Sequence, residues 1–367
     1  MTKQILIWSL ATAFSLLQGC GVTRSVAERE LGGPTGANYA TVNVFYATDR
    51  KSTPSGDVGK RFGGERGEVQ YGTAQVSIPR NHTMGALEAP SVWRFEFRAD
   101  PEKHVVLLDL QAMDATTYLQ SIATQIKRSS RKSAFVFVHG YNVTFEDAAR
   151  RTAQISYDLG FDGAPVFYSW PSLGDVAKYT FDESNVAWST ANLEKFLGDF
   201  AERSQADQIY LIGHSMGTRA MTQAYVSLLD KKPALKKKFI EVILAAPDID
   251  ADVFKRDIAP AMLAGEGKIT LYASSEDVPL KVSKIVHAGY PRAGESGAGL
   301  VLVKGMESID ATGMGTDFLN HSYFAENRSV ISDIFNIVRN GLRAQNRAGL
   351  ERVSMPDAAG TYWRFKK

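Results

Sequence analysis

Cysteine is almost absent from this sequence, since Cys20 is the only one in 367 residues. A lone cysteine cannot pair within the chain, which excludes a fold held together by internal disulfides. An excess of one charge is also lacking, because 42 lysine and arginine residues stand against 40 aspartate and glutamate residues. This near balance gives no indication of a nucleic-acid partner.

An H-E-x-x-H motif and clusters of histidine with cysteine are missing as well, although the chain has six histidines. Patterns of this kind supply the ligands of zinc hydrolases. The sequence therefore predicts neither a metal site nor another cofactor. The apolar fraction of 44% and the charged fraction of 22% are ordinary for a globular protein.

The N-terminal segment lacks an apolar run long enough for a transmembrane helix. Residues 5–17 are apolar and follow Lys3, which is typical of a signal peptide. The run ends in Leu17-Gln18-Gly19-Cys20, which resembles the lipobox of bacterial lipoproteins, where the cysteine becomes the lipidated first residue. We therefore expect residues 1–19 to be a signal peptide and Cys20 to carry the lipid.

The resemblance to lipoproteins implies a place in the bacterial cell envelope. Gly21 stands where an aspartate would signal retention in the inner membrane, so we expect an outer-membrane lipoprotein, held to the membrane through its N-terminal lipid. A plain signal peptide, cleaved nearby to give a secreted or periplasmic protein, is the alternative. Residues 20–40 are polar and contain several glycines, as expected of a tether between anchor and domain.

From residue 134 onward, predicted strands and helices alternate, as in a doubly wound, mostly parallel α/β sheet with helices on both faces. Strands are predicted at 41–48, 72–78, 93–97, 104–110, 134–138, 164–170, 209–212, 239–246, 268–273 and within 300–310. Helices are predicted at 114–127, 144–159, 186–200, 218–229 and 330–342. We expect one domain over residues 41–345, with a long loop at 49–67 and a loosely structured tail at 346–367.

A G-x-S-x-G motif stands at the centre of this pattern, with Ser215 between Gly213 and Gly217. A buried strand precedes the motif and a helix follows it, which is the strand–turn–helix setting of a nucleophilic serine. The turn is so tight that small residues are needed on both sides of the serine. The sequence therefore predicts that Ser215 is a nucleophile whose hydroxyl stands clear of the backbone.

A nucleophilic serine needs a base, and in hydrolases of this kind the chain order is serine, acid, histidine. Only His287 and His321 follow Ser215. His321 comes after the last predicted strand and before the last helix, the expected place of the base, whereas His287 fits a surface or substrate-rim residue. A loop histidine that caps the final helix is the alternative interpretation of His321.

The acid of such a triad is less clearly marked. Asp277 follows the strand two places after the serine strand, which is the usual position. Asp248 follows the strand directly after the serine and is the alternative acid, while Asp310 lies shortly before His321. Chain order alone favours Asp277.

Two backbone amides are expected to hold the oxyanion. One is the amide of Met216, at the start of the helix after the serine, where unpaired N–H groups favour a negative oxygen. The second should come from the loop after strand 134–138, where Tyr141 is the first choice and Asn142 the next. His139 and His214 fit packed structural residues better than a base.

Several short motifs follow one another along the chain. They are Tyr46-Ala-Thr-Asp-Arg50, His139-Gly-Tyr-Asn142, Trp170-Pro-Ser172, Gly213-His-Ser-Met-Gly217, Ala246-Pro-Asp-Ile-Asp250 and His321-Ser-Tyr323. Together they resemble a bacterial branch of the α/β-hydrolase superfamily long catalogued as a domain of unknown function, over roughly residues 41–340. The resemblance implies the α/β-hydrolase fold and a serine hydrolase. Between residues 246 and 268 there is no room for a large cap domain.

The function predicted from these observations is a carboxylic ester hydrolase, of the esterase or lipase kind, that works through an acyl-enzyme and a Ser-Asp-His triad. Its substrate would be a small-molecule or lipid ester. A thioesterase or peptidase with the same triad is the alternative enzyme. A non-catalytic envelope protein that retains the fold is the alternative from another class, since a fold alone does not establish activity. The acyl and alcohol groups and the oligomeric state are not specified by the sequence.

Overall fold

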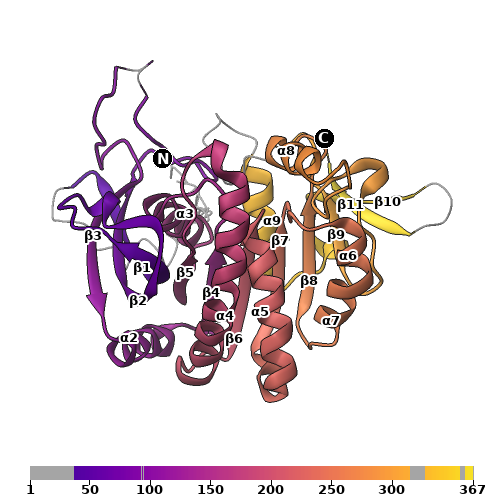
Figure 1. Ribbon diagram of the computed structural model, residues 1–367, viewed down its shortest axis with the longest axis horizontal. Coiled ribbons are helices and arrows are strands. Elements are labelled where there is room, and N and C mark those ends of the chain that lie inside the picture. The colour runs from indigo at the N-terminus through magenta and orange to yellow at the C-terminus, as the bar shows by residue number, and fades with distance from the viewer. Residues whose placement is uncertain (1–36, 92, 94, 315–326, 356–359, 367) are drawn as a thin grey trace, which may run out of the picture.

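The structure is a computed structural model that describes residues 37–91, 93, 95–314, 327–355 and 360–366 (Figure 1). Its strands are β1 (Tyr39–Ser52), β2 (Phe62–Pro79), β3 (Val106–Met113), β4 (Ser133–Val138), β5 (Ala164–Ser169), β6 (Gln208–His214), β7 (Phe239–Ala245), β8 (Lys268–Ala273), β9 (Glu307–Asp310), β10 (Leu350–Ser354) and β11 (Thr361–Phe365). Its α-helices are α2 (Ala115–Arg128), α3 (Phe145–Asp158), α4 (Tyr179–Arg203), α5 (Gly217–Lys231), α6 (Ala251–Val253), α7 (Ala259–Leu263), α8 (Val278–Val286) and α9 (Asn327–Asn340).

All these strands form one sheet in the order β10-β11-β9-β8-β7-β6-β4-β5-β1-β2-β3. Neighbouring strands from β11 through to β1 pair in parallel. The antiparallel pairs of these strands lie at the two margins of the sheet, where β10 pairs with β11, β1 with β2, and β2 with β3. The predicted fold class, a doubly wound and mostly parallel α/β sheet, is confirmed.

Helices cover both faces of the sheet, and the apolar strands explain why. Alternate residues of a strand point to opposite faces. In β4, Val136 and Val138 belong to the core under α2, α4 and α5, whereas Phe135 and Phe137 belong to the core under α3 and α9. In Figure 1, α4 and α5 cross in front of the sheet. The candidate site follows from this layering, because the loops after the parallel strands meet at one edge of the sheet.

The prediction of a loosely structured tail at residues 346–367 is wrong. β11 joins the sheet beside β9, with Trp363 opposite Ile309, and β10 pairs with β11. The sheet thus continues beyond residue 345, the predicted end of the domain. Strands of five residues each carry too little of the alternating pattern to be recognised from the sequence alone.

Two further predictions near the N-terminus also need correction. The loop predicted at residues 49–67 is shorter, because β1 and β2 extend as a twisted ribbon that pairs Arg50 with Arg66 and Ser52 with Phe62. Residues 93–97 form no strand, since the amide of Glu96 donates to the carbonyl oxygen of Ser91 and closes a local turn. In both places local composition did not indicate whether a pairing strand lies alongside.

The segment between β2 and β3, residues 80–104, is here called the excursion. Its first part, from His82 to Glu88, contacts α3. His82 fastens the excursion, because Nε2 lies 2.9 Å from Oδ1 of Asp158 on α3 and Nδ1 lies 2.8 Å from Oε2 of Glu88. Burial alone would lower the pKa of His82, but hydrogen bonds and charges from Asp158 and Glu88 outweigh it and raise the pKa to about 9.

This fastening predicts a pH-dependent stability. A histidine pKa raised from 6.5 in the unfolded chain to about 9 stabilises the fold fully below pH 6.5 and loses that contribution as the pH rises through 9. The contribution is on the order of 3 kcal/mol, at about 1.4 kcal/mol per pKa unit. The His82→Gln variant should therefore show a much flatter fall in the free energy of unfolding between pH 6.5 and 9.5, measured by urea titration. Equal slopes in both proteins would contradict the assignment.

Candidate active site

Ser215 occupies a strained turn between β6 and α5. Its backbone φ is 47°, in the left-handed region that side chains other than glycine rarely adopt. The glycines on either side are required by close packing, because a Cβ at Gly213 would lie 2.5 Å from Cε of Met221 and one at Gly217 would lie 2.1 Å from the carbonyl oxygen of His139. The turn is therefore of the sharp kind that presents a nucleophilic serine.

The backbone of Ser215 is fixed from three directions. Its amide donates to the carbonyl oxygen of Ala245 on β7 at 2.9 Å. Its carbonyl oxygen accepts from Oγ1 of Thr218 at 2.6 Å and from the amide of Asp248 at 3.3 Å. Within the part of the chain that the structure describes, no residue hydrogen-bonds the Ser215 hydroxyl.

The start of α5 and the loop after β4 lie on either side of this turn. Met216 occupies the N-cap of α5, and no side chain caps the helix there, so this helix N-terminus is a favourable place for an anion. A Cβ added to Gly140 would lie only 3.1 Å from Cβ of Ser215, so the loop runs directly against the serine. Tyr141, the first choice named from the sequence, follows Gly140 directly in this loop. The amide of Asn142 instead donates to Oδ2 of Asp182 at 3.2 Å.

Asp182, near the start of α4, holds the β4 loop in shape and was missed in the sequence. Its buried carboxylate also accepts from Oγ of Ser172 at 2.6 Å and from the amide of Leu173 at 2.9 Å. Two separate loops are thus tied to one carboxylate. Nothing in the local sequence marks this aspartate, because its partners come from other elements.

Arg50, at the end of the Tyr46–Arg50 motif, supports the same loop from the other side. Its buried guanidinium donates to the carbonyl oxygens of Val143 and Ser172, each at 2.7 Å. Burial lowers the pKa of Arg50 to about 10, which still leaves it charged at neutral pH. The Tyr46–Arg50 motif drew attention to Arg50 in the sequence. The spacing of the motif did not reveal that Arg50 supports this loop.

His139 is a structural residue, as the sequence predicts. Its ring stacks on Trp170 with centroids 5.0 Å apart, and Nδ1 lies 2.8 Å from the carbonyl oxygen of Gly140. Burial, reinforced by the charge of Arg50, holds the pKa of His139 well below its ordinary value. A neutral, immobilised imidazole therefore lies beneath the β4 loop.

His214 precedes the serine and is also buried and neutral. Burial, with a smaller contribution from the charge of Arg151, lowers its pKa to about 3. Its Nδ1 has no hydrogen-bond partner among the described residues. His214 lines a cavity of about 20 Å³ together with Arg151 and His139. This environment supports the interpretation of His214 as a packed neighbour of the serine.

Asp248, the alternative acid, is fully engaged by other groups. Oδ1 accepts from Oγ of Ser283 at 2.5 Å and from Nε of Arg292 at 2.9 Å. Oδ2 accepts from the hydroxyl of Tyr179 at 2.5 Å and from Nη2 of Arg219 at 3.0 Å. Since a carboxylate has about four acceptor positions, no position is left for an imidazole N–H.

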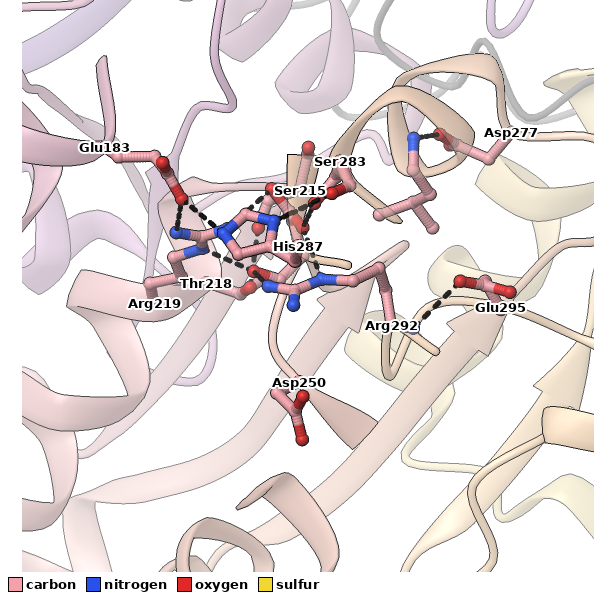
Figure 2. Close-up of polar contacts among 12 residues, drawn as sticks. Glu183, Ser215, Thr218, Arg219, Asp250, Asp277, Ser283, His287, Arg292 and Glu295 are labelled. Carbon is pink, nitrogen blue, oxygen red and sulfur yellow. Dashed lines mark hydrogen bonds and ion pairs between the residues drawn. The ribbon is translucent and has the colours of Figure 1, made fainter. Parts of the chain in front are cut away.

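The charges around Asp248 keep it ionised. Burial alone would raise its pKa, but Arg219 and Arg292 outweigh burial and hold the pKa below its ordinary value. The four partners come from α4, α5, α8 and the loop before Glu295, so the carboxylate joins these elements around the serine turn. Figure 2 shows Arg219 and Arg292 reaching toward the same region from opposite sides.

Asp277, the preferred acid, lies at the carboxyl end of β8, where the sequence places it. It is buried and forms the N-cap of α8, accepting from the amide of Leu280 at 2.8 Å. Figure 2 shows Asp277 away from Arg219 and Arg292, the two arginines that pair with Asp248.

Of the two histidines that follow the serine, the structure describes only His287. His321, the predicted base, lies outside the described residues. His287 ends α8, and both ring nitrogens are engaged, Nε2 at 2.9 Å from Oε1 of Glu183 and Nδ1 at 2.7 Å from the carbonyl oxygen of Ser283. Glu183 also pairs with Arg219 at 2.6 Å. His287 thus links α8 to α4 and α5 at the margin of the site (Figure 2).

Neither a metal site nor a membrane span is found in the described ranges. No group of three or more histidine, cysteine, aspartate or glutamate residues there is arranged to hold a metal ion. No helix among those residues is long and apolar enough to cross a membrane.

The chain matches one protein family over residues 114–339, which is more than half of its length. The family is described as alpha/beta hydrolases of unknown function. No curated protein matches the sequence.

Solved structures of hydrolases and lipases show a distant likeness. A predicted CIB-like hydrolase from Thermoplasma acidophilum is 16% identical with a TM-score of 0.35, and the match covers 64% of this chain and 93% of that one. Aspergillus fumigatus lipase B is 13% identical with a TM-score of 0.29, covering 54% and 49%. Bacillus licheniformis lipase BlEst2 is 12% identical with a TM-score of 0.29, covering 55% and 89%. Likeness at this level carries no information about a substrate.

Proposed function

The chain belongs to the family of alpha/beta hydrolases of unknown function, and from that premise we propose that it is a serine-dependent carboxylic ester hydrolase. The observation that carries the proposal is the strained turn at Ser215, with φ of 47° and the uncapped start of α5 beside it. A strained backbone at a serine between a strand and a helix supports a nucleophilic role for that serine.

The reaction would proceed through an acyl-enzyme. His321 takes the proton from the Ser215 hydroxyl as the oxygen attacks the ester carbonyl, and then gives the proton to the leaving alcohol. The amides of Met216 and Tyr141 hold the negative oxygen of the tetrahedral intermediate. Water, activated by the same histidine, releases the acid. Asp277 orients His321 and stabilises its charged form.

The margin of the site favours an ester with an apolar part. Phe181 on α4 and Ile285, Val286 and Tyr290 at the end of α8 are large, apolar and exposed. His287 joins these two helices through Glu183. Exposed apolar side chains on elements that Asp248 joins around the serine turn suit an acyl chain.

Hydrolysis of a panel of p-nitrophenyl esters of increasing acyl length tests the proposal directly. We expect turnover of esters and covalent labelling by a fluorophosphonate probe. Preference for thioesters or peptides over every ester would assign a different reaction to the same serine. Absence of both labelling and turnover would point to a non-catalytic protein.

We further propose that the mature protein begins at a lipidated Cys20 and resides in the cell envelope, at the outer membrane. The apolar run that ends in Leu-Gln-Gly-Cys, with no other cysteine in the chain, motivates this proposal. One acyl chain holds a protein only marginally at a membrane, whereas two hold it stably, at about 0.8 kcal/mol per buried CH₂. A lipoprotein cysteine carries at least two chains.

Changing Cys20 to serine should therefore release the protein from the membrane fraction and leave its esterase activity intact. Fractionation of cells that produce each form, with mass spectrometry of the N-terminus, measures both. An unmodified N-terminus beyond residue 20 in the wild type would show that the protein is secreted or periplasmic.

A further inference from the structure

We propose that the tip of the excursion, at Trp93 and residues 95–98, is a docking surface for the lipid bilayer. Trp93, Phe95 and Phe97 are 87%, 83% and 77% exposed. Three large aromatic side chains within five residues are seldom left in water, because each could bury a large apolar surface. In Figure 1 the excursion projects from the body of the molecule at the upper left.

The tip is held in a defined shape. The amide of Glu96 donates to the carbonyl oxygen of Ser91 at 3.1 Å, and Oε2 of Glu96 accepts from the amide of Ser91 at 3.1 Å. The same carboxylate lies 3.2 Å from Nε2 of the buried His104. Phe95 adopts a φ of 57°, an uncommon conformation for a bulky residue. These contacts fix Glu96, which lies between the exposed Phe95 and Phe97.

The chemistry of the tip fits a bilayer interface. Tryptophan and phenylalanine are the residues that insert at the level of lipid headgroups, with basic side chains beside them. Arg98 is exposed next to the aromatics. The only acid of the segment, Glu96, is directed back to His104, so the tip presents no carboxylate of its own to anionic headgroups. A protrusion suits a soft, flat partner such as a bilayer better than a protein with a fixed shape.

The point where the chain enters the domain supports the same partner. Tyr39 pairs with Pro79 at the end of the β1–β2 ribbon, and the amide of Arg80 donates to the carbonyl oxygen of Asn38. The excursion therefore starts beside the end of the tether. From Cys20 to Ala37 the chain can reach at most about 60 Å, at 3.3–3.6 Å per residue. In this respect the inference rests on the proposed lipid anchor, which would keep the tip near the membrane surface.

Fluorescence of Trp93 tests the docking. The lipidated protein from Cys20 onward is reconstituted into vesicles of phosphatidylcholine and phosphatidylglycerol, with or without bromine on the acyl chains, because brominated lipid quenches tryptophan that reaches the bilayer. This form keeps four of the five tryptophans, since Trp8 lies in the proposed signal peptide, so wild type is compared with Trp93→Phe, which keeps an apolar ring but removes the fluorophore. We expect fractional quenching at least twofold lower in Trp93→Phe. Trp188→Phe, on α4, is the matched control and should be quenched as strongly as wild type.

A second variant asks whether the aromatics themselves cause the docking. Phe95→Ser combined with Phe97→Ser should reduce the quenching of Trp93 at least twofold and leave hydrolysis of a soluble short-chain ester unchanged. Co-sedimentation with vesicles but equal quenching of wild type and Trp93→Phe would overturn the docking while leaving the anchor intact, and would point to a protein partner. Undiminished quenching in the double variant would overturn it too. Failure to co-sediment would contradict both the anchor and the docking.

Discussion

Replacement of Ser215 by alanine is expected to abolish ester hydrolysis, with kcat lower by on the order of 10⁶-fold, the scale of losses seen when the nucleophile of a triad is removed. The expected loss is large because the remaining amides of Met216 and Tyr141 can hold an oxyanion but cannot form an acyl-enzyme. Fluorophosphonate labelling should disappear together with turnover. Initial rates at saturating ester, measured on purified protein, give the comparison.

The control for this substitution is Ser227→Ala, near the other end of α5. Ser227 is half-buried and lies on the same helix but far from its N-terminus. Both variants should keep the unfolding temperature of the wild type within a few degrees, since each removes one oxygen atom. A Ser215→Ala protein that retained a tenth of wild-type activity would exclude this serine as the nucleophile.

Ser215 could be found from the sequence because its setting is local. The strand, the two glycines and the helix that make the turn all lie within residues 208–231, so pattern and spacing were sufficient. The alternation of strands and helices along the chain and the burial of β4 on both faces also follow from short apolar runs. These features need no knowledge of distant contacts.

The supports of the site could not be predicted in the same way. Arg50 reaches Val143 and Ser172 across about a hundred residues of sequence, and Asp182 ties together two loops that are unrelated in the chain. Such contacts depend on how β1, β4 and β5 lie side by side, which hydrophobic periodicity does not specify. The same reason hid β11, whose place is beside β9.

The choice between the two acids shows what structure adds to chain order. Both Asp248 and Asp277 follow a parallel strand at the edge of the sheet where the serine lies, and the sequence separates them only by position. The structure surrounds Asp248 with two arginines and two hydroxyls. This carboxylate therefore holds α4, α5 and α8 together, and we expect its loss to affect stability first.

Substitution of Asp277 by asparagine should lower kcat by on the order of 10⁴-fold, as when the acid of a triad can no longer orient its histidine. The fold should be little affected, because asparagine is as good an N-cap as aspartate and can still accept from the amide of Leu280. The unfolding temperature should stay close to that of the wild type. Circular dichroism and initial rates on the same samples measure the two effects.

Substitution of Asp248 by asparagine should show the opposite pattern. The amide cannot neutralise Arg219 and Arg292, and its NH₂ group must face donors that the carboxylate accepted from. Removing one partner of a buried ion pair destabilises a protein by about 3–5 kcal/mol, and this effect should appear as a large fall in the midpoint of urea unfolding. At low temperature the fraction that remains folded should keep most of its kcat. The reason is that the backbone N–H at position 248 still donates to the carbonyl oxygen of Ser215. If Asp248→Asn instead lost its activity at unchanged stability while Asp277→Asn stayed active, the acid of the triad would be Asp248.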